Sequence, residues 1–267
     1  MDRMTRLLCA IVLAAIHQGV LAAGFDHDIW DGLLKRHVVM VDRGHASQVN
    51  YQGMKDEHEL LTRYLSRISG VSRGTFDNWP KSEQLAFLIN AYNAWTVELI
   101  LTRYPEIESI KDLGTWFQSP WKRRFIPLLG ATVSLDDIEH GLIRGNPQYR
   151  EPRIHFALNC ASIGCPALRP EAYRGARLES QLEDAVQRFL GDRRRNHFDG
   201  YVLSISRIFK WYREDFERGW GGYTSLEQFL AAHSHALGLP DADVGRLHSG
   251  AIAIEFLDYD WRLNGVP

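Results

Sequence analysis

The chain has 267 residues and a net charge of −2, and 45% of its residues are hydrophobic. Binding to nucleic-acid phosphates requires a basic surface, so this charge argues against nucleic acid as a partner. The composition is that of a globular protein, and the length suits one large domain or two small ones.

The first residues have the pattern of an export signal. Arg3 and Arg6 give a positive start, and Leu7–Ile16 is a short apolar run. Small residues follow around Ala22, as at the cleavage site of a signal peptide. The apolar run is too short to cross a membrane, which takes about 20 apolar residues. We therefore predict a signal peptide over residues 1–23, a periplasmic or secreted protein, and no integral membrane segment in the mature chain.

The remaining residues, 24–267, contain no repeat and no linker rich in Pro, Gly or Ser, so we predict a single domain. Helical spacing and strand-like alternation divide it into several elements. Helices are predicted at 26–39, 57–68, 81–105, 134–145, 178–190, 207–216 and 225–237, and strands at 153–159, 201–206 and 251–261. Long helices with few strands predict an α+β fold, helix-rich, with a small mixed or antiparallel sheet.

The helix at 81–105 is apolar over most of its circumference, which is typical of a helix at the centre of a domain. Asn90 and Asn93 interrupt it three residues apart and therefore lie on one face. Buried amides need hydrogen-bond partners. Two interpretations follow: these amides bind backbone groups of a neighbouring loop, or they help to shape a polar pocket.

The helix at 134–145 carries three polar side chains that suit a site. Ser134 is the predicted N-cap, and Asp137 completes a variant of the capping box. Glu139, His140 and Arg144 follow within the helix. A lone helical histidine is more often a surface or hydrogen-bonded residue than a catalyst.

The stretch RIHFALNCASIGCP, residues 153–166, contains Cys160 and Cys165, the two cysteines outside the predicted signal peptide. Fully extended, the step between them would place their Cα atoms about 17 Å apart, whereas a disulfide needs about 4.4–6.8 Å. The chain must therefore turn between them, and Gly164 favours a turn. Thiols in an oxidising compartment tend to pair, so a structural disulfide is one interpretation.

A second interpretation makes Cys160 a nucleophile, which needs a base such as histidine. In the predicted strand, alternation places His155 and Asn159 on the same face, about 13 Å apart along the strand. His155 would therefore reach Cys160 only if the chain folds back. His140 depends on tertiary packing. A third interpretation makes the histidines and cysteines metal ligands, but their spacing matches no well-known zinc pattern, and we predict no metal site.

Five blocks taken together resemble the DUF547 family and extend from about residue 80 to residue 264. They are LAFLINAYNAWTV, SLDDIEHGLIR, RIHFALNCASIGCPALRP, SRIFKWYREDF and YDWRLN. The family name records an undefined function, and bacterial members are often exported. The resemblance implies that certain polar positions recur: Asn90, Asn93, Glu139, His140, Arg144, His155, Cys160, Lys210 and Asp215. It also implies that the position of Cys165 is less constant, so Cys160 has a role of its own.

These observations lead to one hypothesis and one alternative. The hypothesis is a cysteine-dependent hydrolase or acyl transferase acting on an amide or thioester of an unidentified small molecule or peptide, without a cofactor. Cys160 is the nucleophile, His140 or His155 the base, and Glu139 the residue that orients His140. Four further groups are predicted to shape or charge the pocket, together with the helical Arg144: Asn90, Asn93, Lys210 and Asp215. The alternative is a noncatalytic binding module of the cell envelope with a structural Cys160–Cys165 disulfide.

Overall fold

The structure, a computed structural model, describes residues 24–115 and 117–267. The predicted signal peptide, residues 1–23, lies outside the described residues. Within the described ranges, no helix is both long enough and apolar enough to cross a bilayer.

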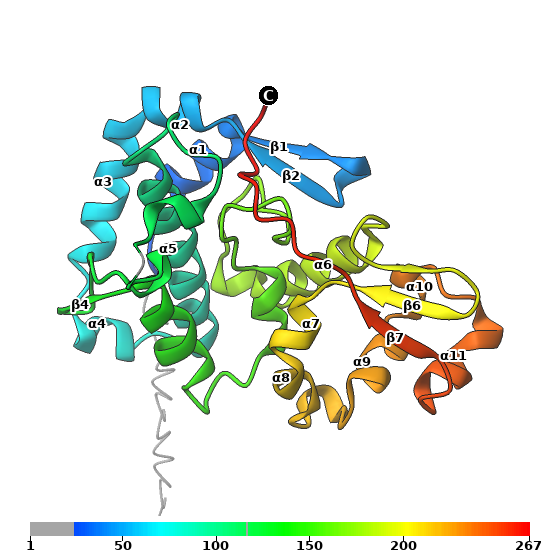
Figure 1. The fold of residues 1–267 in the computed structure, drawn as a ribbon. Helices are drawn as coiled ribbons and strands as arrows, with labels where there is room; N and C mark the ends of the chain where they lie inside the picture. The colour runs from blue at the N-terminus through cyan, green and yellow to red at the C-terminus, as the bar shows by residue number, and fades with distance from the viewer. Residues whose placement is uncertain (1–23, 116) are drawn as a thin grey trace, which may run out of the picture.

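The fold is α+β and helix-rich, as predicted. The α-helices are α1 (Asp28–His37), α2 (Tyr51–Asp56), α3 (His58–Ser69), α4 (Arg73–Asp77), α5 (Lys81–Leu101), α6 (Leu178–Gly191), α7 (Ile208–Trp211), α8 (Arg213–Glu217), α9 (Leu226–Ala232), α10 (Ser234–Leu237) and α11 (Asp241–His248). Figure 1 shows α1 to α5 on one side of the molecule and α7 to α11 on the other. The predicted helices at 207–216 and 225–237 are each split into two, at Tyr212 and at His233.

The strands of the described residues form three small sheets. Two are antiparallel pairs and one is mixed, because β6 pairs antiparallel with β5 and parallel with β7. The strands are β1 (Val38–Val41), β2 (Ala46–Val49), β3 (Ile126–Leu128), β4 (Ala131–Val133), β5 (His197–Phe198), β6 (Val202–Ile205) and β7 (Ala253–Phe256). The predicted final strand, 251–261, is therefore limited to β7.

Two hydrophobic clusters make up the core of the described part of the chain. One gathers around α5, which is buried along most of its length, as its all-round apolar sequence predicted. The other lies between α6, α9 and β6. Helix α6 contributes to both, with Leu182 in the first cluster and Phe189 in the second. Ile154 and Phe156 divide in the same way, so the segment before Cys160 runs along the boundary between the clusters.

The predicted strand at 153–159 was wrong. Residues 152–156 form a 3-10 helix, η5 (Pro152–Phe156), in which the Glu151 side chain accepts a hydrogen bond from the Arg153 backbone N–H. Every residue from 152 to 159 is buried. The apolar alternation therefore does not mark one buried and one exposed face. Polar and apolar side chains alike are buried here, and the polar ones have specific tertiary partners.

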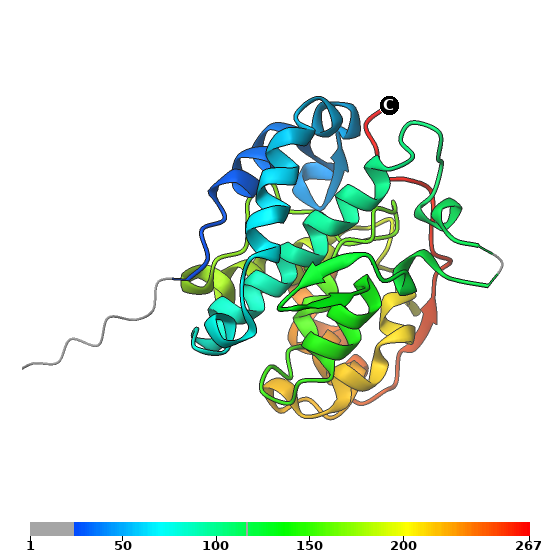
Figure 2. The ribbon, with the colours of Figure 1, turned by 90° about the vertical axis from the view of Figure 1, so that its left-hand side faces the viewer.

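The C-terminal segment after β7 crosses from one side of the molecule to the other (Figure 1). It forms isolated bridges between Leu263 and Ser162 and between Gly265 and Val49. The Leu263 N–H also donates to the Glu108 carbonyl at 2.7 Å, and Figure 2 shows the red segment beside the green loop that follows α5. This path brings Tyr259 next to the two cysteines.

Candidate functional site

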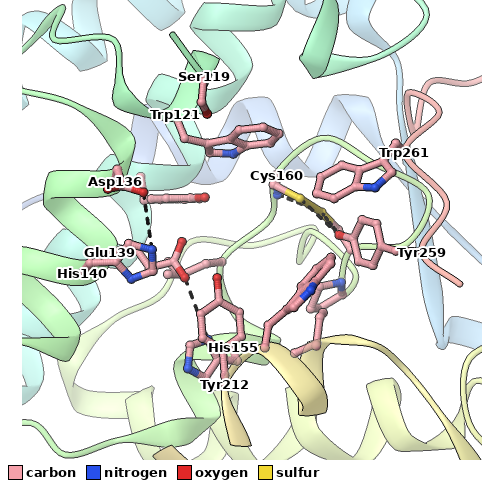
Figure 3. Close-up of a pocket in the computed structure, with 16 residues that line it drawn as sticks. Ser119, Trp121, Asp136, Glu139, His140, His155, Cys160, Tyr212, Tyr259 and Trp261 are labelled. Atoms are coloured by element: carbon pink, nitrogen blue, oxygen red, sulfur yellow. Dashed lines mark hydrogen bonds and ion pairs between the residues drawn. A yellow bond between two sulfur atoms is a disulfide. The ribbon is translucent and has the colours of Figure 1, made fainter. Parts of the chain in front are cut away.

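A pocket of about 230 Å³ lies where the two hydrophobic clusters meet, and segments from six parts of the chain line it. Figure 3 shows its acidic and imidazole groups on one side and Cys160 with Tyr259 and Trp261 on the other. Its lining residues are Tyr92, Ser119, Trp121, Asp136, Glu139, His140, His155, Leu158, Cys160, Cys165, Pro166, Ile208, Trp211, Tyr212, Tyr259 and Trp261. The structure thus brings together all four predicted catalytic residues.

Cys160 and Cys165 are joined as a disulfide, with their Cα atoms 6.2 Å apart. The turn between them places Ala161 in the left-handed region, at φ 63°, where Gly164 had been expected to supply the unusual conformation. Gly164 is needed for another reason: a Cβ there would lie 2.9 Å from the ring of Tyr259. The absence of a side chain at Gly164 lets this tyrosine pack against the turn.

The two cysteines differ in exposure, and their sulfur atoms differ in hydrogen bonding. Cys160 is half-buried and Cys165 is 2% exposed. The Cys165 Sγ accepts a hydrogen bond from the Cys160 backbone N–H at 2.9 Å and one from the Tyr259 hydroxyl at 3.2 Å. The same hydroxyl lies 3.2 Å from the Cys160 Sγ. Burial raises the pKa of Tyr259, so the phenol stays protonated and can donate.

His155 is fixed by a carboxylate. Its Nε2 lies 2.7 Å from the Oδ2 of Asp215, and its ring stacks on Tyr212 at 3.8 Å between centroids. Burial lowers the pKa of His155 below its usual value, so the ring is neutral at pH 7. Burial alone would raise the pKa of Asp215, but hydrogen bonds from His155 and Arg144 outweigh it and hold that pKa well below its usual range. His155 therefore donates through Nε2–H to Asp215, which leaves Nδ1 as an acceptor, 4.0 Å from Glu139.

Glu139 and His140 come from a π-helix, η4 (Asp137–Arg144), which begins at the predicted capping box: Ser134 and Asp137 exchange hydrogen bonds at 3.0 Å. Short π-helical turns occur often at functional sites. The His140 Nδ1 accepts from Arg144 at 2.8 Å. Its Nε2 lies 3.4 Å from Asp136. The partners of His140 are thus Arg144 and Asp136, and not Glu139 as predicted.

No hydrogen bond joins the Cys160 sulfur to either imidazole within the described residues. Its hydrogen-bonding contacts are the Tyr259 hydroxyl and, at 4.0 Å, the Ser162 hydroxyl. The predicted combination of a free thiol and an adjacent imidazole base is therefore not formed in this disulfide state. The two histidines line the same pocket as the sulfur without touching it.

Two of the predicted binding residues, Asn90 and Asn93, form hydrogen bonds with backbone groups and do not line the pocket. The Asn90 amide donates to the Tyr173 carbonyl at 2.7 Å and accepts from the Tyr173 N–H at 3.0 Å. The Asn93 amide donates to Ala157 at 3.0 Å and accepts from Asn159 at 2.9 Å. Both amides are buried and neither lines the pocket. Of the two interpretations, the backbone clamp is the one observed.

The other three predicted binding residues divide between two places. Lys210 is exposed and is not part of the pocket wall. Arg144 and Asp215 lie behind the two histidines, where the Arg144 Nε donates to Asp215 at 2.6 Å. They also line a neighbouring cavity of about 550 Å³. These two residues therefore position the imidazoles and do not face the sulfur.

Sequence reasoning missed the aromatic wall. Trp121, Trp211, Tyr259 and Trp261 contact one another around the disulfide, with ring centroids 4.4–5.7 Å apart. The only signal in the sequence is the high number of tryptophans, eight in the chain. Asp136 was also missed, although it stands one turn before His140. Among residues 24–115 and 117–267, no group of three His, Cys, Asp or Glu side chains has the arrangement of a metal site.

Residues 76–190 match a family model described as a protein of unknown function, DUF547. The resemblance to DUF547 is therefore confirmed over this segment. Neither a curated protein nor a solved structure matches the chain. The DUF547 match includes Glu139, His155 and the two cysteines, whereas Asp215 and Tyr259 lie beyond it. Residues outside the matched segment thus complete the pocket.

Proposed function

We propose that the protein works outside the cytoplasm as a thiol–disulfide exchange enzyme in which Cys160 is the sulfur that reacts with substrate. Export is inferred from the N-terminal sequence. One observation carries the proposal: both cysteines line an aromatic pocket, but Cys160 is half-buried, whereas Cys165 is almost completely buried and its sulfur accepts two hydrogen bonds. An exposed attacked sulfur and a stabilised leaving sulfur are what disulfide exchange requires.

In the first step, a substrate thiolate attacks the Cys160 Sγ. A substrate–Cys160 disulfide forms, the Cys160–Cys165 bond breaks, and its electron pair stays on Cys165 as a thiolate. The Cys160 N–H and the Tyr259 hydroxyl stabilise this thiolate by donating to it. A second substrate thiol then attacks the substrate sulfur, which releases Cys160 and an oxidised substrate. A small-molecule disulfide returns the dithiol to its oxidised form by the same exchange.

The incoming thiol must lose its proton, because the thiolate is the nucleophile. The pocket offers Glu139 and the neutral ring of His155, which lie 4.0 Å apart and share one wall. Together they can accept one proton from a bound thiol. Asp215 stabilises the imidazolium that results, because its carboxylate remains ionised beside the Nε2–H.

Two single-cysteine variants test the proposal. Cys165→Ala leaves a free Cys160, and this variant should form a mixed disulfide with cystamine that intact-protein mass spectrometry detects. Cys160→Ala leaves the buried Cys165 and should react at least about tenfold more slowly, because access limits exchange. Urea far below the unfolding midpoint serves as the control: it should not change the rate for Cys165→Ala.

Equal reactivity of the two variants, or reaction only under unfolding conditions, would overturn the proposal. Either result would favour the noncatalytic cell-envelope module with a structural disulfide. The wild-type protein adds a direct measurement. Its disulfide should open with a low-molecular-weight thiol while near-UV circular dichroism remains native.

A second candidate is acyl transfer or hydrolysis by Cys160 once the disulfide has been reduced. The specific observation in its favour is the Asp215–His155 pair on the pocket wall, because an oriented neutral imidazole is the usual base of a cysteine hydrolase. Thioesters and amides of small aromatic acids would test it with the Cys165→Ala variant. An acyl-enzyme adduct on Cys160 that disappears in His155→Ala would support it, and the absence of any adduct would rule it out.

A further inference from the structure

The pocket wall carries negative charge without a full cationic partner. Asp136 and Glu139 are its two carboxylates, and no lysine or arginine of the described chain lines it. The ion-pair contact of Glu139 is His155 at 4.0 Å, and that of Asp136 is His140 at 3.4 Å. Imidazoles compensate such charge only when they are protonated, and burial keeps His155 neutral.

Two guanidinium groups that contact pocket-lining residues, those of Arg144 and Arg195, have carboxylate partners elsewhere. Arg144 binds Asp215 at 2.6 Å, and Arg195 lies 3.2 Å from Asp192. Each of these pairs is close to neutral as a unit, so neither cancels the charge of the two pocket carboxylates. A positively charged ligand would therefore gain electrostatic free energy on entering the pocket.

The opposite wall is aromatic. Trp121, Trp211, Tyr259 and Trp261 present rings around the disulfide, which can pack against the hydrocarbon part of a small thiol. The Lys111 ammonium lies 3.7 Å from the centroid of Trp261, so this wall is the less favourable one for a ligand ammonium. Lys111 itself is not part of the pocket lining.

The arrangement of these groups suggests how a ligand is oriented. Figure 3 shows Glu139 and Asp136 across the pocket from Cys160. A molecule with an amine at one end and a sulfur at the other can therefore place its ammonium near the carboxylates and its thiol at the disulfide. With a volume of about 230 Å³, the pocket suits a small molecule or the end of a chain and not a folded protein segment.

We propose that the substrates are small thiols with a protonated amine, and that Glu139 and Asp136 select them over anionic thiols. This inference rests on the thiol–disulfide exchange proposed above and goes beyond it by naming the charge class of the substrate.

The test compares three thiols of similar size on the oxidised wild-type protein: cysteamine, 2-mercaptoethanol and mercaptoacetate. For each thiol, the rate at which it opens the protein disulfide is divided by the rate at which the same thiol opens a small uncharged model disulfide under the same conditions. This ratio corrects for differences in thiol pKa. The corrected rate for cysteamine should exceed that for mercaptoacetate by about tenfold or more, with 2-mercaptoethanol between them. The preference should shrink in 1 M salt, where screening is strong.

Glu139→Gln and Asp136→Asn should each reduce this preference several-fold. Glu139→Gln should also slow disulfide opening by all three thiols, because Glu139 and His155 together accept the proton of the incoming thiol. Glu214→Gln is the matched control, because it removes an exposed carboxylate that does not line the pocket. Should Glu139→Gln fail to fold, Asp136→Asn still tests selection, because Asp136 is partly exposed.

The outcomes separate the two proposals. Equal corrected rates for all three thiols, or a preference that Asp136→Asn and Glu139→Gln leave intact, would overturn the charge selection without affecting the exchange reaction. A disulfide that none of the three thiols opens in the folded protein would overturn the exchange reaction itself.

Discussion

The amides of α5 and the carboxylates of the pocket are both polar groups in largely apolar surroundings, but they face different partners. Asn90 and Asn93 each bind one backbone carbonyl and one backbone N–H, so both amide atoms are used. Glu139 and Asp136 face a cavity, and their ion-pair contacts are imidazoles at 4.0 Å and 3.4 Å.

This difference separates a structural from a functional role. A buried amide whose nitrogen and oxygen both bind backbone groups fixes the position of a loop, and its burial away from the pocket keeps it from a ligand. A carboxylate at a cavity retains lone pairs that a ligand can use. The backbone hydrogen bonds of Asn93 still matter to the site, because they hold Ala157 and Asn159 in place immediately before Cys160.

The largest expected effect is on stability, from Asn93→Ala. The substitution leaves the Ala157 carbonyl and the Asn159 N–H without a partner in a buried region, which should lower the free energy of unfolding by about 2–5 kcal/mol. Urea denaturation measures this loss. Asn78→Ala is the control, because the Asn78 amide is exposed where it donates to Gly74, and it should cost less than about 1 kcal/mol. Equal losses in the two variants would show that the clamp does not hold the loop.

A smaller, pH-dependent effect is expected from Asp215→Asn. The pKa of Asp215 is lowered in the folded protein, so its ionised form contributes stability above the unfolded value of about 3.9, and that contribution is lost as the pH falls below it. The wild type should therefore be more stable than the variant by about 1–3 kcal/mol at pH 7. The difference should shrink towards pH 3.

Denaturation of the two proteins at both pH values provides the measurement. Taking the difference between them cancels the other carboxylates, which titrate in both. A stability difference that stays constant from pH 7 to pH 3 would contradict the assigned pairing of Asp215 with His155 and Arg144.

The smallest effect is expected at Lys210. Its side chain is exposed and lies outside the pocket lining, so Lys210→Ala should change the free energy of unfolding by less than about 0.5 kcal/mol. The rate of disulfide opening should also be unchanged. Trp211→Ala is the neighbouring comparison, because its ring lines the pocket, and it should alter that rate. A strong effect of Lys210→Ala on exchange would assign it a role that its position does not suggest.

Local patterns predicted the elements that local interactions determine. The central helix follows from its all-round apolar composition, and the start of the helix that carries Glu139 follows from Ser134 and Asp137, which are three residues apart. The position of His155 was not predictable in the same way. The segment around His155 alternates between apolar and polar residues as a strand does, but the segment lies between the two hydrophobic clusters and is buried on both sides. Alternation signals a strand only when one face of the segment meets water.

The sequence alone determined the α+β class, the central buried helix, the similarity of residues 76–190 to the DUF547 family and the polar residues worth testing, because these depend on spacing along the chain. Tertiary structure alone decided that the two sulfurs are joined, that Asp215 and not Glu139 fixes an imidazole, and that Tyr259 and Trp261 close the pocket. Cys160 and Tyr259 are almost a hundred residues apart. Only the packing of the C-terminal segment across the molecule brings them into contact, and no periodicity within either segment records that path.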